Sequence, residues 1–64
     1  MDDISVLICD DSALMRNLIG RIVDETEGMK VVARAENGLD LIEKLKTVQP
    51  DVILLDIQMP QMDG

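Results

Sequence analysis

The chain contains no aromatic residue and no histidine, and only one cysteine among its 64 residues. Hydrophobic residues still make up 47% of the sequence, so the core must be built from aliphatic side chains. A single cysteine cannot form an intramolecular disulfide, and Cys9 falls inside an apolar run, as free cysteines of reducing compartments commonly do. Without histidine the chain also lacks a Ser-His-Asp hydrolase triad.

Basic residues are scarce as well. Six Lys and Arg stand against 13 Asp and Glu, which gives a formal net charge of -7. This balance argues against nucleic acid and against an anionic membrane surface as partners, and it suits a cation or a positively charged protein. The start of the chain does not resemble a signal peptide, and no apolar stretch approaches the ~18 residues of a membrane span. We therefore expect a cytoplasmic protein that does not associate with membranes.

The first half of the chain predicts a strand followed by a helix. An apolar run over residues 4–9 predicts the strand. Ser12 is a candidate N-cap for a helix over residues 13–23, which Glu25 to Gly28 would end. The helically spaced apolar positions, which we expect to form its buried face, are Met15, Leu18, Ile19 and Ile22. Arg16 falls on the opposite face, where we expect a solvated residue; a functional role near the site or at an interface is the alternative.

The second half predicts a strand, a helix and a strand. Residues 29–35 alternate apolar and polar positions, as an edge strand would. Asn37 is the candidate N-cap of a helix that extends to Val48 and stops before Pro50. The continuous apolar run over residues 52–55 is typical of a strand buried on both faces.

The order strand, helix, strand, helix, strand predicts an α/β fold with a parallel sheet and right-handed crossovers. Asp10, Asp11 and Asp56 follow the first and third strands, which would be neighbours in this sheet. The carboxyl ends of parallel strands share one edge, so we expect the three aspartates to lie together there.

Three carboxylates at one edge need a counter-charge. Oxygen ligands without His or Cys favour Mg²⁺ or Mn²⁺ over zinc. Such a site suits phosphoryl transfer, in which a carboxylate such as that of Asp56 is itself the nucleophile. The alternative is structural: Asp10 and Asp11 would be acids at a helix N-terminus, and Asp56 would cap a turn.

The sequence resembles the first half of a response-regulator receiver domain of two-component signalling. The segments that carry the resemblance are Val6–Ser12, Ala35–Gly38 and Pro50–Gly64. It implies a flavodoxin-like sheet with strand order 2-1-3 in this half. It also implies that Asp56 is the phospho-acceptor, that Asp11 binds Mg²⁺ directly and Asp10 mainly through water, and that the main-chain carbonyl of Gln58 is a further ligand.

Within that family, Asp10 to Arg16 is most similar to the receivers of chemotaxis protein-glutamate methylesterases. The resemblance implies a chemotaxis histidine kinase as phosphodonor and an output that demethylates chemoreceptor glutamates. A single-domain chemotaxis receiver is the alternative. An aspartyl-nucleophile phosphatase of the haloacid-dehalogenase type is a further rival, but it requires an acid where this chain has Gln58.

The resemblance also implies that residues 1–64 are a truncated receiver that ends before its third helix. A hydroxyl residue and a lysine of later strands would complete the site. We therefore expect a fragment that is not itself an enzyme, binds Mg²⁺ weakly and is phosphorylated poorly. Cut here, the third strand becomes an exposed edge, so we expect self-association, with a symmetric dimer as its simplest form. A non-functional half-domain that self-assembles is the remaining alternative.

Overall fold

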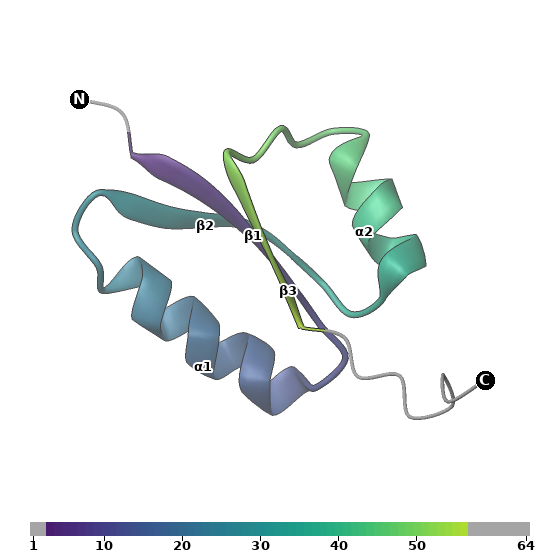
Figure 1. The fold of residues 1–64 in the computed structure, drawn as a ribbon, viewed down its shortest axis with the longest axis horizontal. Helices are drawn as coiled ribbons and strands as arrows, with labels where there is room; N and C mark the ends of the chain where they lie inside the picture. The colour runs from purple at the N-terminus through teal and green to yellow at the C-terminus, as the bar shows by residue number, and fades with distance from the viewer. Residues whose placement is uncertain (1–2, 57–64) are drawn as a thin grey trace.

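A computed structural model of the chain describes residues 3–56. The elements are β1 (Ile4–Asp10), α1 (Ala13–Asp24), β2 (Met29–Ala35), α2 (Gly38–Leu45) and β3 (Val52–Asp56). The strands form a parallel sheet in the order β2-β1-β3, with α1 and α2 on opposite faces (Figure 1). The predicted α/β fold and the strand order 2-1-3 are confirmed.

β1 is the centre of the molecule because both neighbouring strands pair with it and helices cover both of its faces. Its residues Val6 to Cys9 have no exposed surface. Val6 and Ile8 pack with Val23 of α1, whereas Leu7 and Cys9 pack with Ala35. The aliphatic core that the composition requires is therefore divided into two small clusters, one on each side of this strand.

A β-bulge changes which side chains of β2 face which helix. Val6 pairs with Val31, but the next residue, Leu7, pairs with Ala33, so Val32 is the extra residue. Val31 therefore packs with the cluster under α1, while Ala33 packs with the cluster on the other face. The regular alternation read from the sequence would have placed both on one face. The prediction of β2 as a partly exposed edge strand is confirmed.

The predicted buried face of α1 is wrong by part of a turn. The residues of this helix that are buried are Gly20 and Val23, with Ile19 partly buried, while Met15, Leu18 and Ile22 are exposed. On the buried side of α1, Gly20 lies close to β2: a Cβ atom at this position would lie 2.9 Å from Nη2 of Arg34. The absence of a side chain at this position lets the Arg34 guanidinium lie against the helix.

The ends of the helices largely follow their predicted signals. The Ser12 hydroxyl accepts a hydrogen bond from the Met15 amide at 3.3 Å, and the Asn37 side chain accepts one from the Asp40 amide at 2.8 Å. Both predicted N-caps are therefore confirmed. α2 is shorter than predicted: it ends at Leu45, and the Val48 amide bonds the Lys44 carbonyl within the turn that follows.

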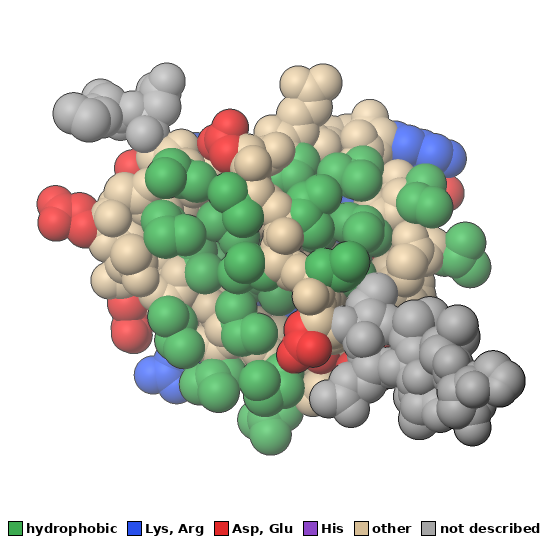
Figure 2. All heavy atoms as spheres, in the orientation of Figure 1, with side chains coloured by type: hydrophobic (Ala, Val, Ile, Leu, Met, Phe, Trp, Pro, Cys, Tyr) green, Lys and Arg blue, Asp and Glu red, His purple; other side chains and the backbone are tan. Residues whose placement is uncertain are grey.

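The prediction that the third strand is buried on both faces is wrong for the part of the chain that the structure describes. The large side chains of β3 are 38–60% exposed, because α1 packs on β1 and β2 and α2 packs on β2. Within residues 3–56, β3 lies at the edge of the sheet with exposed apolar side chains, as expected. Hydrophobic side chains gather across the face that carries β3 (Figure 2). Neither described helix is long and apolar enough to cross a membrane.

Candidate functional site

The carboxyl ends of β1 and β3 bring two acidic residues side by side. β1 ends at Asp10 and β3 ends at Asp56, and the two residues are partners in the parallel ladder. Neighbouring strands lie about 4.8 Å apart, and residues in register point to the same face of the sheet. Asp10 and Asp56 therefore start from adjacent backbone positions at the edge of the sheet where the sequence predicts the site.

The Asp10 carboxylate is buried, and only one of its two oxygens has a partner. The residue is 2% exposed, and its Oδ1 accepts a hydrogen bond from the Ser12 amide at 2.9 Å. Its Oδ2 is buried and has no hydrogen-bond partner within residues 3–56. An unpaired buried carboxylate oxygen is costly, so it needs an explanation in a native protein. A bound cation, or a water held by one, would provide the missing partner.

The other predicted metal ligands are less well defined. Asp11 is exposed in the bend between β1 and α1. Within residues 3–56 no group of three or more His, Cys, Asp or Glu side chains is arranged to hold a metal ion. Gln58 lies outside the described residues. Mg²⁺ commonly uses one or two protein carboxylates and keeps several waters. The two acids that the described residues bring together in the ladder are Asp10 and Asp56, and no printed contact joins Asp11 to them.

Arg16, expected on the solvated face of α1, contacts the turn that carries Asp10 and Asp11. Its side chain is half-buried, and its Nη1 donates a 2.7 Å hydrogen bond to the main-chain carbonyl of Asp10. The prediction was wrong because α1 is rotated so that Arg16, Ile19 and Val23 lie on the side of the sheet. The signal in the sequence is its position: Arg16 lies one helical turn before Gly20, the residue of closest approach.

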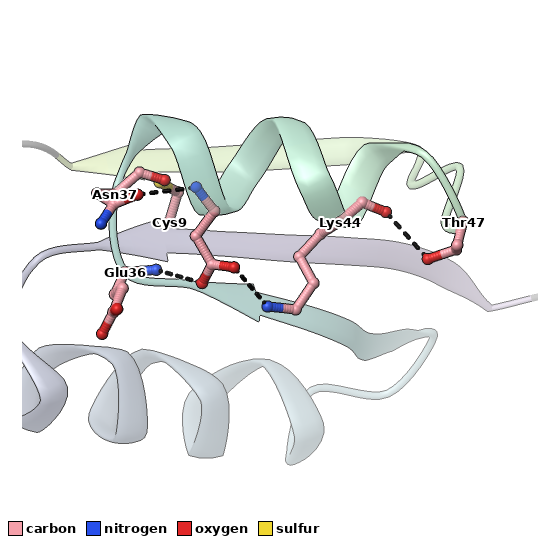
Figure 3. Close-up of polar contacts among 6 residues, drawn as sticks. Cys9, Glu36, Asn37, Lys44 and Thr47 are labelled. Atoms are coloured by element: carbon pink, nitrogen blue, oxygen red, sulfur yellow. Dashed lines mark hydrogen bonds and ion pairs between the residues drawn. The ribbon is translucent and has the colours of Figure 1, made fainter.

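The start of α2 contains a second polar cluster beside the same edge. The Asp40 carboxylate accepts hydrogen bonds from the Glu36 amide at 3.1 Å and from Lys44 Nζ at 2.9 Å (Figure 3). The bond from Lys44, followed by that from Glu36, lowers the pKa of the Asp40 carboxyl. These contacts join the start of α2 to the end of β2, so the role of Asp40 is structural.

The one cysteine belongs to this cluster rather than to the acidic pair. The Cys9 thiol donates to the main-chain carbonyl of Asn37 at 3.5 Å and is buried (Figure 3). Burial, and next the charge of Asp40, raise the pKa of this thiol. A thiol of raised pKa is a poor nucleophile, so Cys9 acts as a core residue.

At the opposite edge of the sheet, Asp51 joins the start of β3 to β1. Its carboxylate accepts from the Ser5 amide at 2.9 Å and from the Ser5 hydroxyl at 3.0 Å, and its own amide bonds the Ser5 carbonyl at 2.9 Å. The bonds from the Ser5 amide and then the hydroxyl lower the pKa of the Asp51 carboxyl. This clamp fixes the register that places Asp56 beside Asp10.

The chain is similar to known receiver domains. The family model described as "Response regulator receiver domain" matches residues 6–64. A "Protein-glutamate methylesterase/protein-glutamine glutaminase" of Treponema denticola is 61% identical over the whole chain, which spans 17% of that protein's length. A protein of the same name from Clostridium acetobutylicum is 48% identical, again over the whole chain and 19% of the relative.

A shorter relative matches nearly as well. The "Chemotaxis protein CheY" of Listeria monocytogenes is 48% identical over 95% of the chain, and the match spans 50% of that protein. The chain thus spans half the length or less of these relatives. The similarity to the N-terminal part of methylesterase receivers, predicted from Asp10 to Arg16, is confirmed, and the phosphatase alternative is excluded by the family match.

Proposed function

Because the chain belongs to the response regulator receiver domain family, we propose that Asp56 accepts a phosphoryl group from a histidine kinase of a chemotaxis system. The observation that best supports this role is the register of the sheet. In this register Asp56 and Asp10 are neighbouring positions of β3 and β1, and Asp10 is a buried acid with one oxygen that has no partner within residues 3–56. Two carboxylates on neighbouring strands can serve as the phosphoryl acceptor and as a ligand of the cation beside it.

The reaction is a transfer between two nucleophiles. A carboxylate oxygen of Asp56 attacks the phosphorus of a phosphohistidine, the P–N bond breaks, and the imidazole leaves with that electron pair and takes up a proton. The product is an acyl phosphate on Asp56. The exposure of Asp56 suits this step, since the donor histidine belongs to another protein.

We further propose that Mg²⁺, or Mn²⁺ in its place, binds beside the acceptor. Asp11 would bind it directly, Asp10 through water, and Asp56 and the main-chain carbonyl of Gln58 would complete the protein ligands. A bound divalent cation offsets the negative charge on the phosphoryl oxygens. The unpartnered Oδ2 of Asp10 supports this assignment.

The acceptor role is tested by intact-mass spectrometry of the chain after incubation with a small phosphodonor such as acetyl phosphate, with and without Mg²⁺. We expect one phosphoryl group to be added slowly and only with Mg²⁺, and the Asp56→Asn variant to remain unmodified. Asp3→Asn is the matched control, since Asp3 is an exposed aspartate at the opposite end of β1. Equal labelling of Asp56→Asn would show that another residue is the acceptor.

For the output we propose a methylesterase that demethylates chemoreceptor glutamates. The whole-chain identity of 61% with the Treponema denticola protein supports this, whereas the Listeria relative supports a single-domain receiver. The coding sequence surrounding this segment distinguishes the two. A downstream hydrolase domain with a serine nucleophile and a histidine supports the methylesterase, and a stop codon after one complete receiver contradicts it.

We also propose that the 64-residue chain self-associates, most simply as a dimer, through β3. Within residues 3–56 this strand has a hydrogen-bonded neighbour on one side only, and its Ile53 is 41% exposed. Unpaired apolar edges of this kind add further strands. In sedimentation velocity we expect a concentration-dependent dimer that Ile53→Lys shifts to monomer and Asn17→Lys, on the exposed side of α1, does not. A wild-type chain that stays monomeric at high concentration would contradict this proposal.

A further inference from the structure

Arg16 stands at a position that is unfavourable for its own helix. It lies in the first turn of α1, after the N-cap Ser12, and this turn contains no acidic residue. The N-terminus of a helix carries a partial positive charge, so a cation is better placed at the other end. Residues that are unfavourable for the helix in which they lie are commonly found at functional sites.

The interaction that explains this position is made with the backbone between the two acids. Arg16 Nη1 donates to the Asp10 carbonyl at 2.7 Å in a partly buried environment. This carbonyl belongs to the peptide that joins Asp10 to Asp11, so the hydrogen bond fixes the plane from which both side chains start. The Ser12 amide holds the Asp10 carboxylate at 2.9 Å. The acidic turn, residues 10–12, is thus held by two contacts. Arg16 bonds its backbone, and the Ser12 amide bonds the Asp10 side chain.

We propose that Arg16 is a positioning residue of the cation site, acting through the Asp10–Asp11 peptide. The hydrogen bond to the Asp10 carbonyl sets the direction of the Asp11 carboxylate, which is exposed and has no other described side-chain contact to orient it. This inference rests on the proposed function, since the cation is the one assigned there. Outer contacts that orient a metal ligand commonly change metal affinity by about 10–100-fold when they are removed.

If Arg16 acts by positioning, its replacement changes Mg²⁺ affinity in one direction; if it acts only through its charge, the change is in the opposite direction. A guanidinium beside a cation site repels the cation, so a role limited to charge predicts tighter Mg²⁺ binding when Arg16 is neutralised. A positioning role predicts weaker binding, because the carboxylates lose their shared orientation. A neutral side chain that still donates a hydrogen bond should restore part of the affinity.

The experiment is an Mg²⁺ titration of the 64-residue chain, followed by the amide NMR signals of the acidic turn, for Arg16→Met, Arg16→Gln and the control Arg21→Met. Arg21 lies in the last turn of the same helix and is exposed, so its replacement removes the same charge without this contact. We expect Arg16→Met to weaken Mg²⁺ binding by about tenfold or more, Arg16→Gln to be intermediate, and Arg21→Met to stay within about twofold of wild type. Unchanged or tighter binding by Arg16→Met overturns the proposal.

Two further measurements keep the result interpretable. If Arg16→Met loses its helical circular dichroism, Arg16→Gln decides alone: weaker binding supports positioning, and equal or tighter binding overturns it. Hydrogen exchange of the Asp11 and Ser12 amides without metal should accelerate in Arg16→Met and not in Arg21→Met, and no acceleration overturns the positioning role. A wild-type chain that shows this acceleration pattern but no response to Mg²⁺ would refute the proposed cation site and leave the contact established.

Discussion

Replacing Asp10 with asparagine should stabilise the chain and at the same time weaken its response to Mg²⁺. The Asp10 carboxylate is 2% exposed, and its Oδ2 has no partner. An unsatisfied buried polar group costs about 1–3 kcal/mol, and more when it is charged. Asparagine retains an oxygen for the Ser12 amide but leaves its own amide group buried. Only the part of the cost that is due to charge is therefore recovered, and we expect a gain of about 1 kcal/mol.

For a chain of this size, a gain of about 1 kcal/mol raises the midpoint of thermal unfolding by about 4–8 °C. The assay is far-UV circular dichroism at one fixed protein concentration, since the chain has no tryptophan or tyrosine for fluorescence. At an Mg²⁺ concentration about 100 times the wild-type Kd, wild type should gain about 2.7 kcal/mol. An affinity loss of about 10–100-fold, as for an outer contact, should reduce the gain of Asp10→Asn to about 0.4–1.4 kcal/mol. Asp3→Asn is the control and should behave as wild type. A destabilised Asp10→Asn that responds to Mg²⁺ as strongly as wild type would refute the assignment of Asp10.

Three further predictions concern the scaffold that holds the acids. Leu7→Ala should cost about 2–5 kcal/mol, because Leu7 is fully buried, whereas Leu14→Ala, 76% exposed, should change stability by less than about 0.5 kcal/mol in denaturant unfolding. Asn37→Ala should cost about 1 kcal/mol through the lost cap on the Asp40 amide, and Asn17→Ala on the exposed side of α1 should not. Because the folded-state pKa of Asp51 lies below its ordinary 3.8, its stabilisation is complete above that pH and is lost as the pH falls through the lower value. In Asp51→Asn the free energy of unfolding should fall less steeply as the pH is lowered through this range. If its dependence on pH equals that of wild type, the contact between Asp51 and Ser5 does not stabilise the fold.

The sequence was sufficient to predict the order of elements and the neighbouring acids. The apolar run of β1, the caps at Ser12 and Asn37 and the alternation of strands with helices are local signals, and together with the rules for parallel sheets they predict that Asp10 lies beside Asp56. These features depend on residues that are close in the chain and on one topological rule.

Several of the errors involve features set by tertiary packing. The bulge at Val32 depends on how β2 meets β1, and the orientation of α1 depends on the packing of Val23 against β1. In both cases the contact joins two different elements. The environment of Arg16 was mistaken for the same reason, since its contact with Asp10 forms only once α1 lies at that angle.

The central claim is that Asp56 is the residue that receives the phosphoryl group, and locating the group tests it most directly. Borohydride reduction of the labelled chain converts an aspartyl phosphate to homoserine, and peptide sequencing by mass spectrometry then identifies the position. We expect homoserine at residue 56 alone, and only after incubation with Mg²⁺. Homoserine at residue 10 or 11, or a phosphoryl group on a hydroxyl side chain, would contradict it.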